Sequence, residues 1–439
     1  MSLTTVQHTL RKHFMDTTNA PKERIFTRYQ VFVIAILALL QFTVILDFMV
    51  LNPLSEILMR KWDITAAQFG LVVSGYAFSA GISGVLAAGF ADKFDRKKML
   101  LVFYTGFIIG TYLCALAPNY IMLLAARVVT GLFGGVISAI GMAIVADLFR
   151  PETRGRVMGF IQMAFALSQI VGIPVGWELA IRFEWHAPFW MIGVLGTMMG
   201  ILIAVYMRPI TEHLTKKTEK NAFRHLWDTL RNRRYTLAFG TMVLMATGGY
   251  MLMPFGNAFS IHNMGIHPGQ ITFLFMAVGA ANLVSAPFIG RFTDKFGRVN
   301  VFYIASLITT VMVVIFTHRG ITPLWLAIII NSIMMIGVFG RMIPVQALMT
   351  SMPALQDRGA FMSINASIQQ LAGGLAAVLA GQIIHKTSTG YLEHYDTLGF
   401  VIVGALIITT VMITLLNRQI TSEKTNTGVR PPENVAAAH

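Results

Sequence analysis

The sequence Gly290-Arg-Phe-Thr-Asp-Lys-Phe-Gly-Arg298 is a short polar loop between two long apolar stretches, 270–289 and 300–317. A related loop, Ala88-Gly-Phe-Ala-Asp-Lys-Phe-Asp-Arg96, lies 202 residues earlier and also separates two apolar stretches. A helix that crosses a membrane needs about 20 mostly apolar residues, so each flanking stretch is long enough to be a span. Two copies of one loop in the same setting predict a membrane protein built from two equivalent halves.

The composition of the whole chain agrees with a membrane location. Of the 439 residues, 55% are hydrophobic and 12% are charged, and the mean hydropathy is +0.65. A soluble domain has about 25% charged residues, so a soluble protein of this length and composition would lack the polar surface that it needs. The single cysteine, Cys114, excludes both a disulfide framework and a thiolate metal cage.

Twelve apolar stretches long enough to span a membrane follow one another along the chain. They are 31–55, 67–88, 99–117, 121–146, 157–179, 187–207, 235–261, 270–289, 300–317, 323–350, 359–384 and 397–417. We therefore predict an all-α polytopic membrane protein with twelve transmembrane helices in two pseudo-symmetric six-helix bundles, residues 29–207 and 235–417. The other parts are predicted to be an N-terminal tail at 1–28, a polar central loop at 208–234 and a C-terminal tail at 418–439.

Lysine and arginine are distributed unequally between the two sides of the predicted bundles. The side with both termini and the central loop carries 27 of them and the other side carries 5, which leaves only Arg127 and Arg341 inside spans. Because basic loops stay in the cytoplasm, we predict a multi-pass protein of the cell (inner) membrane with both termini cytoplasmic. The same loops explain the net charge of +14. No nucleic-acid motif accompanies that charge, so the expected partners are the lipid bilayer and a small molecule, and not nucleic acid.

The loops and two span motifs resemble those of the major facilitator superfamily, nearest in pattern to its twelve-helix drug:proton antiporters. The family's loop after helix 2 has Gly, then Asp four positions on, then a basic residue, Gly and Arg, and the copy at 290–298 has all of these. The first copy has Ala88 and Asp95 at the two glycine positions, and Asp tolerates a positive φ less readily than Gly. Leu46–Leu54 resembles the family's Asp-containing motif of helix 1, and Arg127–Gly131 resembles its intramembrane Arg motif of helix 4.

The resemblance implies a secondary active transporter that works by alternating access, with proton-coupled efflux of amphipathic small molecules as the expected activity. The antiporter motif of helix 5 is matched only in part, by Gly172-Ile-Pro-Val-Gly176. A proton symporter or a facilitator of a polar metabolite, such as a sugar or an organic acid, is therefore the alternative, and a non-transporting sensor or scaffold is a third. Motifs for nucleotide binding, hydrolases and metalloproteases are absent. We expect no enzyme activity, no cofactor and no metal site, and we expect the protein to act as a monomer with protons as its coupling ion.

Asp47 in the first span and Arg127 in the fourth are charged residues within the membrane. Asp47 lies about seven residues, or ~10 Å, from the outer end of its span, and Arg127 lies about six residues, or ~9 Å, from the same face. Since charged residues within a membrane line a cavity or pair with one another, these two are predicted to face each other. Asp47 is either a titrating proton-coupling site with Arg127 as its partner, or half of a static ion pair that joins helices 1 and 4.

A third charged residue, Arg341, lies deep in the tenth span. It either meets an anionic substrate, or extends to the inner headgroups or pairs locally. The candidate substrate-binding residues are Gln41, Tyr76, Gln162, Gln169, Tyr250, Asn257, Asn331, Arg341, Asn365 and Gln369. Each neutral member of this set is alternatively an interhelical hydrogen bond. Glu56 and Glu178, near the outer helix ends, are expected to be solvated rim residues, with Glu178 as a weaker candidate for binding a cation or a proton.

Charged residues at the inner helix ends are predicted to form a cytoplasmic gate. In the family, the Asp that matches Asp92 caps the N-terminus of helix 11, here 359–362, and by the same logic Asp294 caps helix 5 at 155–158. Arg96 is expected to meet Asp147, and Arg298 to lie beside Asp294. The alternative is that these residues only set topology and loop shape, although topology needs only Lys and Arg. The predicted gate residues are Asp92, Arg96, Asp147, Asp294 and Arg298.

Overall fold

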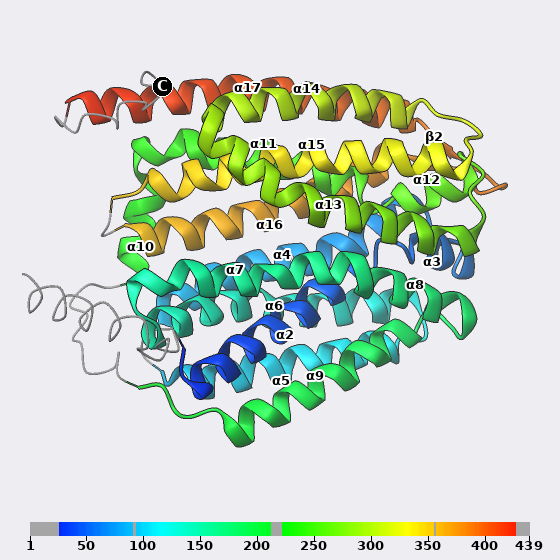
Figure 1. Cartoon of the computed structure of the whole chain (residues 1–439). Coiled ribbons are helices and arrows are strands. Elements are labelled where there is room, and N and C mark those ends of the chain that lie inside the picture. The colour runs from blue at the N-terminus through cyan, green and yellow to red at the C-terminus, as the bar shows by residue number, and fades with distance from the viewer. Residues whose placement is uncertain (1–25, 91–93, 212–221, 355–356, 427–439) are drawn as a thin grey trace, which may run out of the picture.

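The computed structural model describes residues 26–90, 94–211, 222–354 and 357–426, and nearly all of them are helical. The first group of elements is α2 (Arg28–Val50), α3 (Ser55–Lys61), α4 (Ala66–Phe90), α5 (Arg96–Ala115), α6 (Tyr120–Leu148), α7 (Pro151–Leu167), the π-helix η2 (Ser168–Gly172), α8 (Ile173–Arg182) and α9 (Ala187–Tyr206). The second group is α10 (Ala222–Arg231), α11 (Arg233–Leu252), α12 (Gly256–His262), α13 (Pro268–Phe296), α14 (Arg298–Thr317), α15 (Leu324–Ser351), α16 (Arg358–Ile383), the two-residue strands β1 (His385–Lys386) and β2 (Leu392–Glu393), and α17 (Tyr395–Asn426). The long helices lie side by side in two bundles (Figure 1), so the chain is an all-α polytopic membrane protein.

Among the described residues, eleven helical segments are long and apolar enough to cross a membrane. The twelfth predicted span, 359–384, is α16, a helix of 26 residues that runs along the others but is less apolar (Figure 1). Its most extensive contact is with α4 of the other bundle. This contact places Ser367 of α16 against Gly84 of α4, at the seam between the bundles and away from lipid.

Two of the predicted spans, 31–55 and 235–261, are interrupted in the structure. The first changes from α2 to α3 around Pro53, and the second changes from α11 to α12 around Pro254. A proline nitrogen cannot donate the hydrogen bond that a continuous helix needs, so each proline ends a helix. The two breaks lie at matching places in the first helix of each half, which extends the repeat from the loops to the spans.

The two copies of the repeated loop use different turns. Gly297 has a φ of +86° between α13 and α14, a conformation that favours glycine. Asp95 has a φ of −56° at the matching place, and its carboxylate accepts hydrogen bonds from the backbone N–H groups of Lys97 and Ile210. The first copy therefore replaces the glycine turn by a capped start of α5.

The loop after α6 and the loop after α15 each lead to an arginine that binds the end of the preceding helix. Arg154 donates to the carbonyl oxygens of Ala146 and Phe149 at the end of α6. Arg358 donates to the carbonyl oxygen of Thr350 at the end of α15. In both halves the guanidinium group satisfies carbonyls that the last turn of a helix leaves without a partner.

The buried apolar residues are arranged differently at the two ends of the molecule. We call the end at which α2 begins and α17 ends the terminal face, and the other end the opposite face (Figure 1). Near the opposite face, one core joins both bundles and contains Leu54, Phe69 and Phe255. Toward the terminal face there are two cores, one in each bundle, around Ile140 and around Phe361. The apolar core is therefore shared by the bundles at the opposite face and divided between them toward the terminal face.

Candidate functional site

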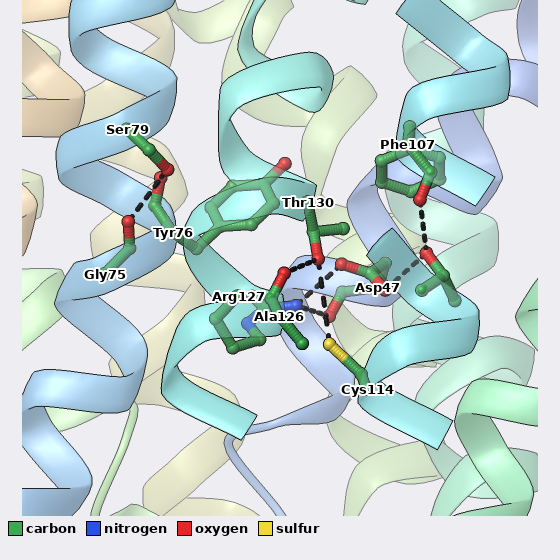
Figure 2. A network of polar contacts seen from close by, with 10 residues as sticks. Asp47, Gly75, Tyr76, Ser79, Phe107, Cys114, Ala126, Arg127 and Thr130 are labelled. Carbon is green, nitrogen blue, oxygen red and sulfur yellow. Dashed lines mark hydrogen bonds and ion pairs between the residues drawn. The ribbon is translucent and has the colours of Figure 1, made fainter. Parts of the chain in front are cut away.

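Asp47 of α2 and Arg127 of α6 form a buried ion pair, as the sequence predicts. Arg127 Nη1 lies 2.6 Å from Asp47 Oδ2 and 3.2 Å from the Asp47 carbonyl oxygen, and both side chains are 0% exposed (Figure 2). Thr111 of α5 donates its hydroxyl proton to Asp47 Oδ1 at 3.1 Å. Three helices of the N-terminal bundle, α2, α5 and α6, thus meet at one buried carboxylate.

The guanidinium group of Arg127 is only partly satisfied. Its Cζ lies 4.5 Å from the centre of the Tyr76 ring (Figure 2), which provides a cation–π contact. Among the described residues, Nε and Nη2 have no hydrogen-bond partner. Because unsatisfied buried donors are costly, a proton or a water molecule that reaches this site changes the balance of its interactions.

A row of aromatic rings connects the ion pair to the other bundle. Tyr76 lies 5.3 Å from Phe48 between ring centres, and Phe48 lies 5.7 Å from Tyr250 of α11. The Tyr250 hydroxyl donates to Gln370 Oε1 of α16 at 2.6 Å. Tyr76 and Tyr250, both predicted as substrate contacts, are therefore brought together across the seam with Phe48, which sequence reasoning missed.

A cavity of about 90 Å³ lies between the two helix breaks. We call it the central cavity because residues of both bundles line it. Its wall contains Asn257 and Asn331, two of the predicted substrate residues. Residues not predicted for this site also line it, among them Asn52, Met253, Ser260, Phe275 and Met334. Pro53 and Pro254 were the available signal, because a proline in an apolar span indicates a break where polar backbone and side chains become accessible.

The remaining predicted substrate residues are dispersed. Gln41 accepts a hydrogen bond from Ser138 at 3.1 Å within the N-terminal bundle. Gln162 is exposed, Gln369 is half-buried, and Asn365 is buried with its Oδ1 unpaired among the described residues. The structure therefore does not gather these four residues into one site with the central cavity.

Gln169 joins the bundles at a distortion in a helix. It lies in the π-helical turn that precedes Pro174, and π turns commonly arise where a proline disturbs the backbone hydrogen bonds. Asn282 Nδ2 of α13 donates to Gln169 Oε1 at 3.1 Å. The span 157–179, predicted to be one continuous helix, thus contains a π-helical turn at the place where Gln169 contacts the other bundle.

Further hydrogen bonds join the bundles near the opposite face. Asn257 Nδ2 donates to the carbonyl oxygen of Pro53 at 2.6 Å, and Trp177 Nε1 donates to that of Pro268 at 3.0 Å. Glu178 accepts a hydrogen bond from Thr272 at 3.0 Å. These bonds close the opposite face around the common core.

Glu56 belongs to the same closure, and its prediction as a solvated rim residue is wrong. It is 6% exposed, and its Oε1 lies 3.3 Å from His262 Nε2 of the other bundle and 3.7 Å from Arg60 Nε. Burial alone raises the pKa of this carboxyl, but the hydrogen bond from His262 and the charges of Arg60, His262 and Lys386 outweigh burial, so the pKa lies below its ordinary value. Because the helix breaks at Pro53, Glu56 lies on the separate helix α3, where its side chain is buried. The hydropathy of the span does not predict this break.

Arg341 lies inside the C-terminal bundle. It is 4% exposed. Its Nη2 lies 3.5 Å from Met245 Sδ, and its Cζ lies 5.4 Å from the centre of the Phe302 ring. The side chain is buried against these two residues and does not extend to the end of the helix, which leaves the anionic substrate and the local contact as its alternatives.

The predicted gate residues lie at the terminal face, and Asp92 falls outside the described residues. Arg96 Nε lies 3.1 Å from Asp147 Oδ2, as expected, but this pair joins α5 and α6 of one bundle. Asp294 is exposed and has no hydrogen bond or ion pair within the described ranges, so it does not cap α7 in this conformation. Arg298 donates to the carbonyl oxygen of Ala347 and to the Ser351 hydroxyl at the end of α15, again within one bundle.

A second, larger cavity lies away from these residues. It is a groove of about 910 Å³ between α13 and α14, floored by α15. Its lining is apolar apart from Ser285 and includes Phe288, Phe292 and Ile304. Such a lining suits hydrocarbon chains, and it contains none of the predicted site residues.

Comparison with known proteins agrees with this architecture. The sequence model of the Major Facilitator Superfamily matches residues 37–261 and, a second time, 238–437. The Uncharacterized MFS-type transporter YceJ of Bacillus subtilis (strain 168) is 25% identical over 253 residues, which are 57% of this chain and 64% of that protein. The Probable sugar efflux transporter of Helicobacter pylori (strain ATCC 700392 / 26695) is 22% identical over 371 residues, 84% of this chain and 91% of that protein.

A solved structure has the same fold. A bacterial homolog of the human lysosomal transporter Spinster, in an inward-facing and occupied conformation, is similar with a TM-score of 0.72 and 16% sequence identity, over 91% of this chain and 99% of that one. Proteins of this fold bind small-molecule substrates within the membrane. The two matches of the family model together cover most of the chain, and the protein therefore belongs to the Major Facilitator Superfamily, as a transporter and not an enzyme.

Proposed function

We propose that this transporter couples the export of amphipathic small molecules to proton movement by alternating access, with Asp47 and Arg127 as the coupling site. Both termini are cytoplasmic in this proposal, the protein resides in the cell (inner) membrane, and it acts as a monomer. The basic residues of the terminal-face loops support this orientation.

The observation that carries the proposal is the enclosure of the Asp47–Arg127 pair. Of the ion pairs in the described part of the chain, it is the one with both side chains fully buried. The ring row Tyr76–Phe48–Tyr250 connects it to the moving partner bundle. A proton on Asp47 removes the charge that Arg127 binds, so protonation at this place changes the forces between the bundles.

The conformation supports alternating access. The bundles share one apolar core at the opposite face and have separate cores toward the terminal face, an arrangement that suits an opening toward the cytoplasm in the proposed orientation. In the outward-facing state the bonds at Asn257, Trp177 and Glu56 must break while the gate residues of the terminal face approach one another. The central cavity between the helix breaks is then reached from the other side.

The test is proton movement in proteoliposomes. Amphipathic cationic, neutral and anionic dyes are added to vesicles that contain the purified protein and a pH-sensitive dye in the lumen. We expect transported dyes to drive a lumenal pH change with the wild type and not with Asp47→Asn. Glu184→Gln, which removes an exposed carboxylate of the same bundle, should retain the change. An unchanged proton signal in Asp47→Asn would show that the pair is structural.

One observation favours a second candidate, the transport of a polar metabolite. Three asparagines, Asn52, Asn257 and Asn331, line the central cavity, and neutral amides bind hydroxyl groups well. One similar protein is named as a probable sugar efflux transporter. Uptake of labelled sugars by the same vesicles distinguishes this candidate, because the amphipathic dyes would then not compete.

A further inference from the structure

Arg341 is a buried guanidinium group without a carboxylate. Its contacts within the described residues are the Met245 sulfur at 3.5 Å and the Phe302 ring at 5.4 Å, and its Nε has no partner there. A thioether is a weak acceptor. Together with one cation–π contact, it recovers less free energy than is lost when a guanidinium leaves water. The position therefore calls for an anion.

Among the residues that the structure describes, no acidic side chain forms an ion pair with Arg341. Between residues 235 and 417 the acidic residues are Asp294, Asp357, Glu393 and Asp396. Three of them lie at helix ends, and Glu393 lies in the short strand β2. In the N-terminal bundle, the fully buried carboxylate is Asp47, which Arg127 already binds. Within the described part of the chain, the interior of the bundles thus carries one positive charge without a carboxylate partner.

Helix geometry places Arg341 on the wall that continues the central cavity. Met334 of α15 and Leu252 of α11 line that cavity. Arg341 follows Met334 by seven residues, and its contact Met245 precedes Leu252 by seven. Seven residues are about two turns, or ~10 Å, and return to nearly the same helix face. Arg341 and Met245 therefore lie beside each other below the cavity, on the side where the bundles separate.

We infer that Arg341 binds the anionic group of the transported molecule, so that the substrates are amphipathic organic anions: carboxylates, sulfonates or phosphate monoesters with an apolar body. This inference rests on the proposed transport function and names its substrate class. The planar guanidinium group binds such oxyanions with paired hydrogen bonds. The apolar body lies against the methionine and aromatic side chains between Arg341 and the cavity, which adapt to different shapes.

The first test compares three probes with one ring system and different charges. 2-Naphthoate, 2-naphthamide and 2-naphthylmethylamine are added to the full-length protein in detergent, and its unfolding temperature is measured. We expect only the naphthoate to raise the unfolding temperature of the wild type. The shift should disappear in Arg341→Met and Arg341→Gln. Arg341→Lys keeps the charge and loses the fork, so it should need about tenfold more naphthoate. Arg319→Gln removes an exposed arginine and should keep the full shift.

The second measurement uses the protein without any probe. Removal of an unneutralised buried charge should leave Arg341→Met at least as stable as the wild type, whereas a structural arginine would lower the unfolding temperature when replaced. Three results overturn the inference: equal shifts with all three probes or with none, a naphthoate shift that survives in Arg341→Met, or a less stable Arg341→Met without probe. The coupling test measures proton movement in Asp47 variants, whereas this test measures ligand binding in Arg341 variants. A negative result in one test therefore does not decide the other.

Discussion

At the Asp47–Arg127 pair, one short contact of 2.6 Å stands beside two unpaired guanidinium nitrogens. The first of these facts follows from the sequence, because helical depth alone brings the two residues to the same level. The second does not, because the positions of Thr111 and Tyr76 depend on how α4 and α5 pack around the pair. Sequence thus predicts which charges meet, and packing decides how well each one is satisfied.

Replacement of one member of this pair should cost far more than replacement of both. Arg127→Met leaves a buried carboxylate alone, and loss of one partner of a buried pair typically costs about 3–5 kcal/mol. We expect a marked fall in the unfolding temperature of the purified protein, and partial recovery in Arg127→Met combined with Asp47→Leu. Arg319→Gln is the control at an exposed site. Equal stability of the single and double variants would contradict a coupled pair.

Glu56 should make the closed opposite face sensitive to acid. Its pKa is lowered in the folded protein, so its stabilising contribution is complete at neutral pH and is lost as the pH falls through that lowered value. The unfolding temperature of the wild type should therefore fall more steeply below about pH 4 than that of Glu56→Gln, which starts lower at pH 7. Glu393→Gln, at an exposed site of the same face, should follow the wild type. A parallel acid response of Glu56→Gln and wild type would exclude this role.

At the scale of elements, the seam between α4 and α16 depends on close backbone approach. A Cβ atom added at Gly70 would lie 2.6 Å from the carbonyl oxygen of Ala377, and backbone cannot move aside as a flexible side chain does. Gly70→Ala should therefore destabilise the protein by about 1–3 kcal/mol, seen as a lower unfolding temperature. Gly290→Ala is the matched control, because nothing lies within 4 Å of its Cβ position. It should be neutral or slightly stabilising, since alanine suits a helix better. Equal effects of the two variants would place the seam elsewhere.

The helices themselves were largely predictable, and their interruptions were not. Length and apolar character identify each span, and α16 was expected although it is less apolar than the rest. The breaks at Pro53 and Pro254 escaped because hydropathy is averaged over a window and a single proline hardly changes it. Residues at these breaks line the central cavity. Because the breaks were not predicted, several residues of the cavity wall were not predicted either.

At the scale of the whole molecule, accessibility should differ between the two faces. The one native cysteine, Cys114, is 0% exposed, so it need not be removed before labelling. A cysteine in place of Arg208, which is exposed in the loop after α9 at the terminal face, should react rapidly with a maleimide, and one in place of Ser260, which is 3% exposed at the central cavity, should react slowly. Unmodified protein gives the background. Equally fast labelling at both positions would contradict the closed opposite face.

Because the apolar residues near the opposite face belong to both bundles at once, each cycle of the proposed alternating access exposes that shared interior to water and buries it again. Water around newly uncovered hydrocarbon raises the heat capacity. Turnover in such a machine follows a curved Eyring plot instead of a straight line. In the proposed mechanism, the temperature of fastest transport then depends on the shared apolar core between the bundles as well as on the protonation of Asp47.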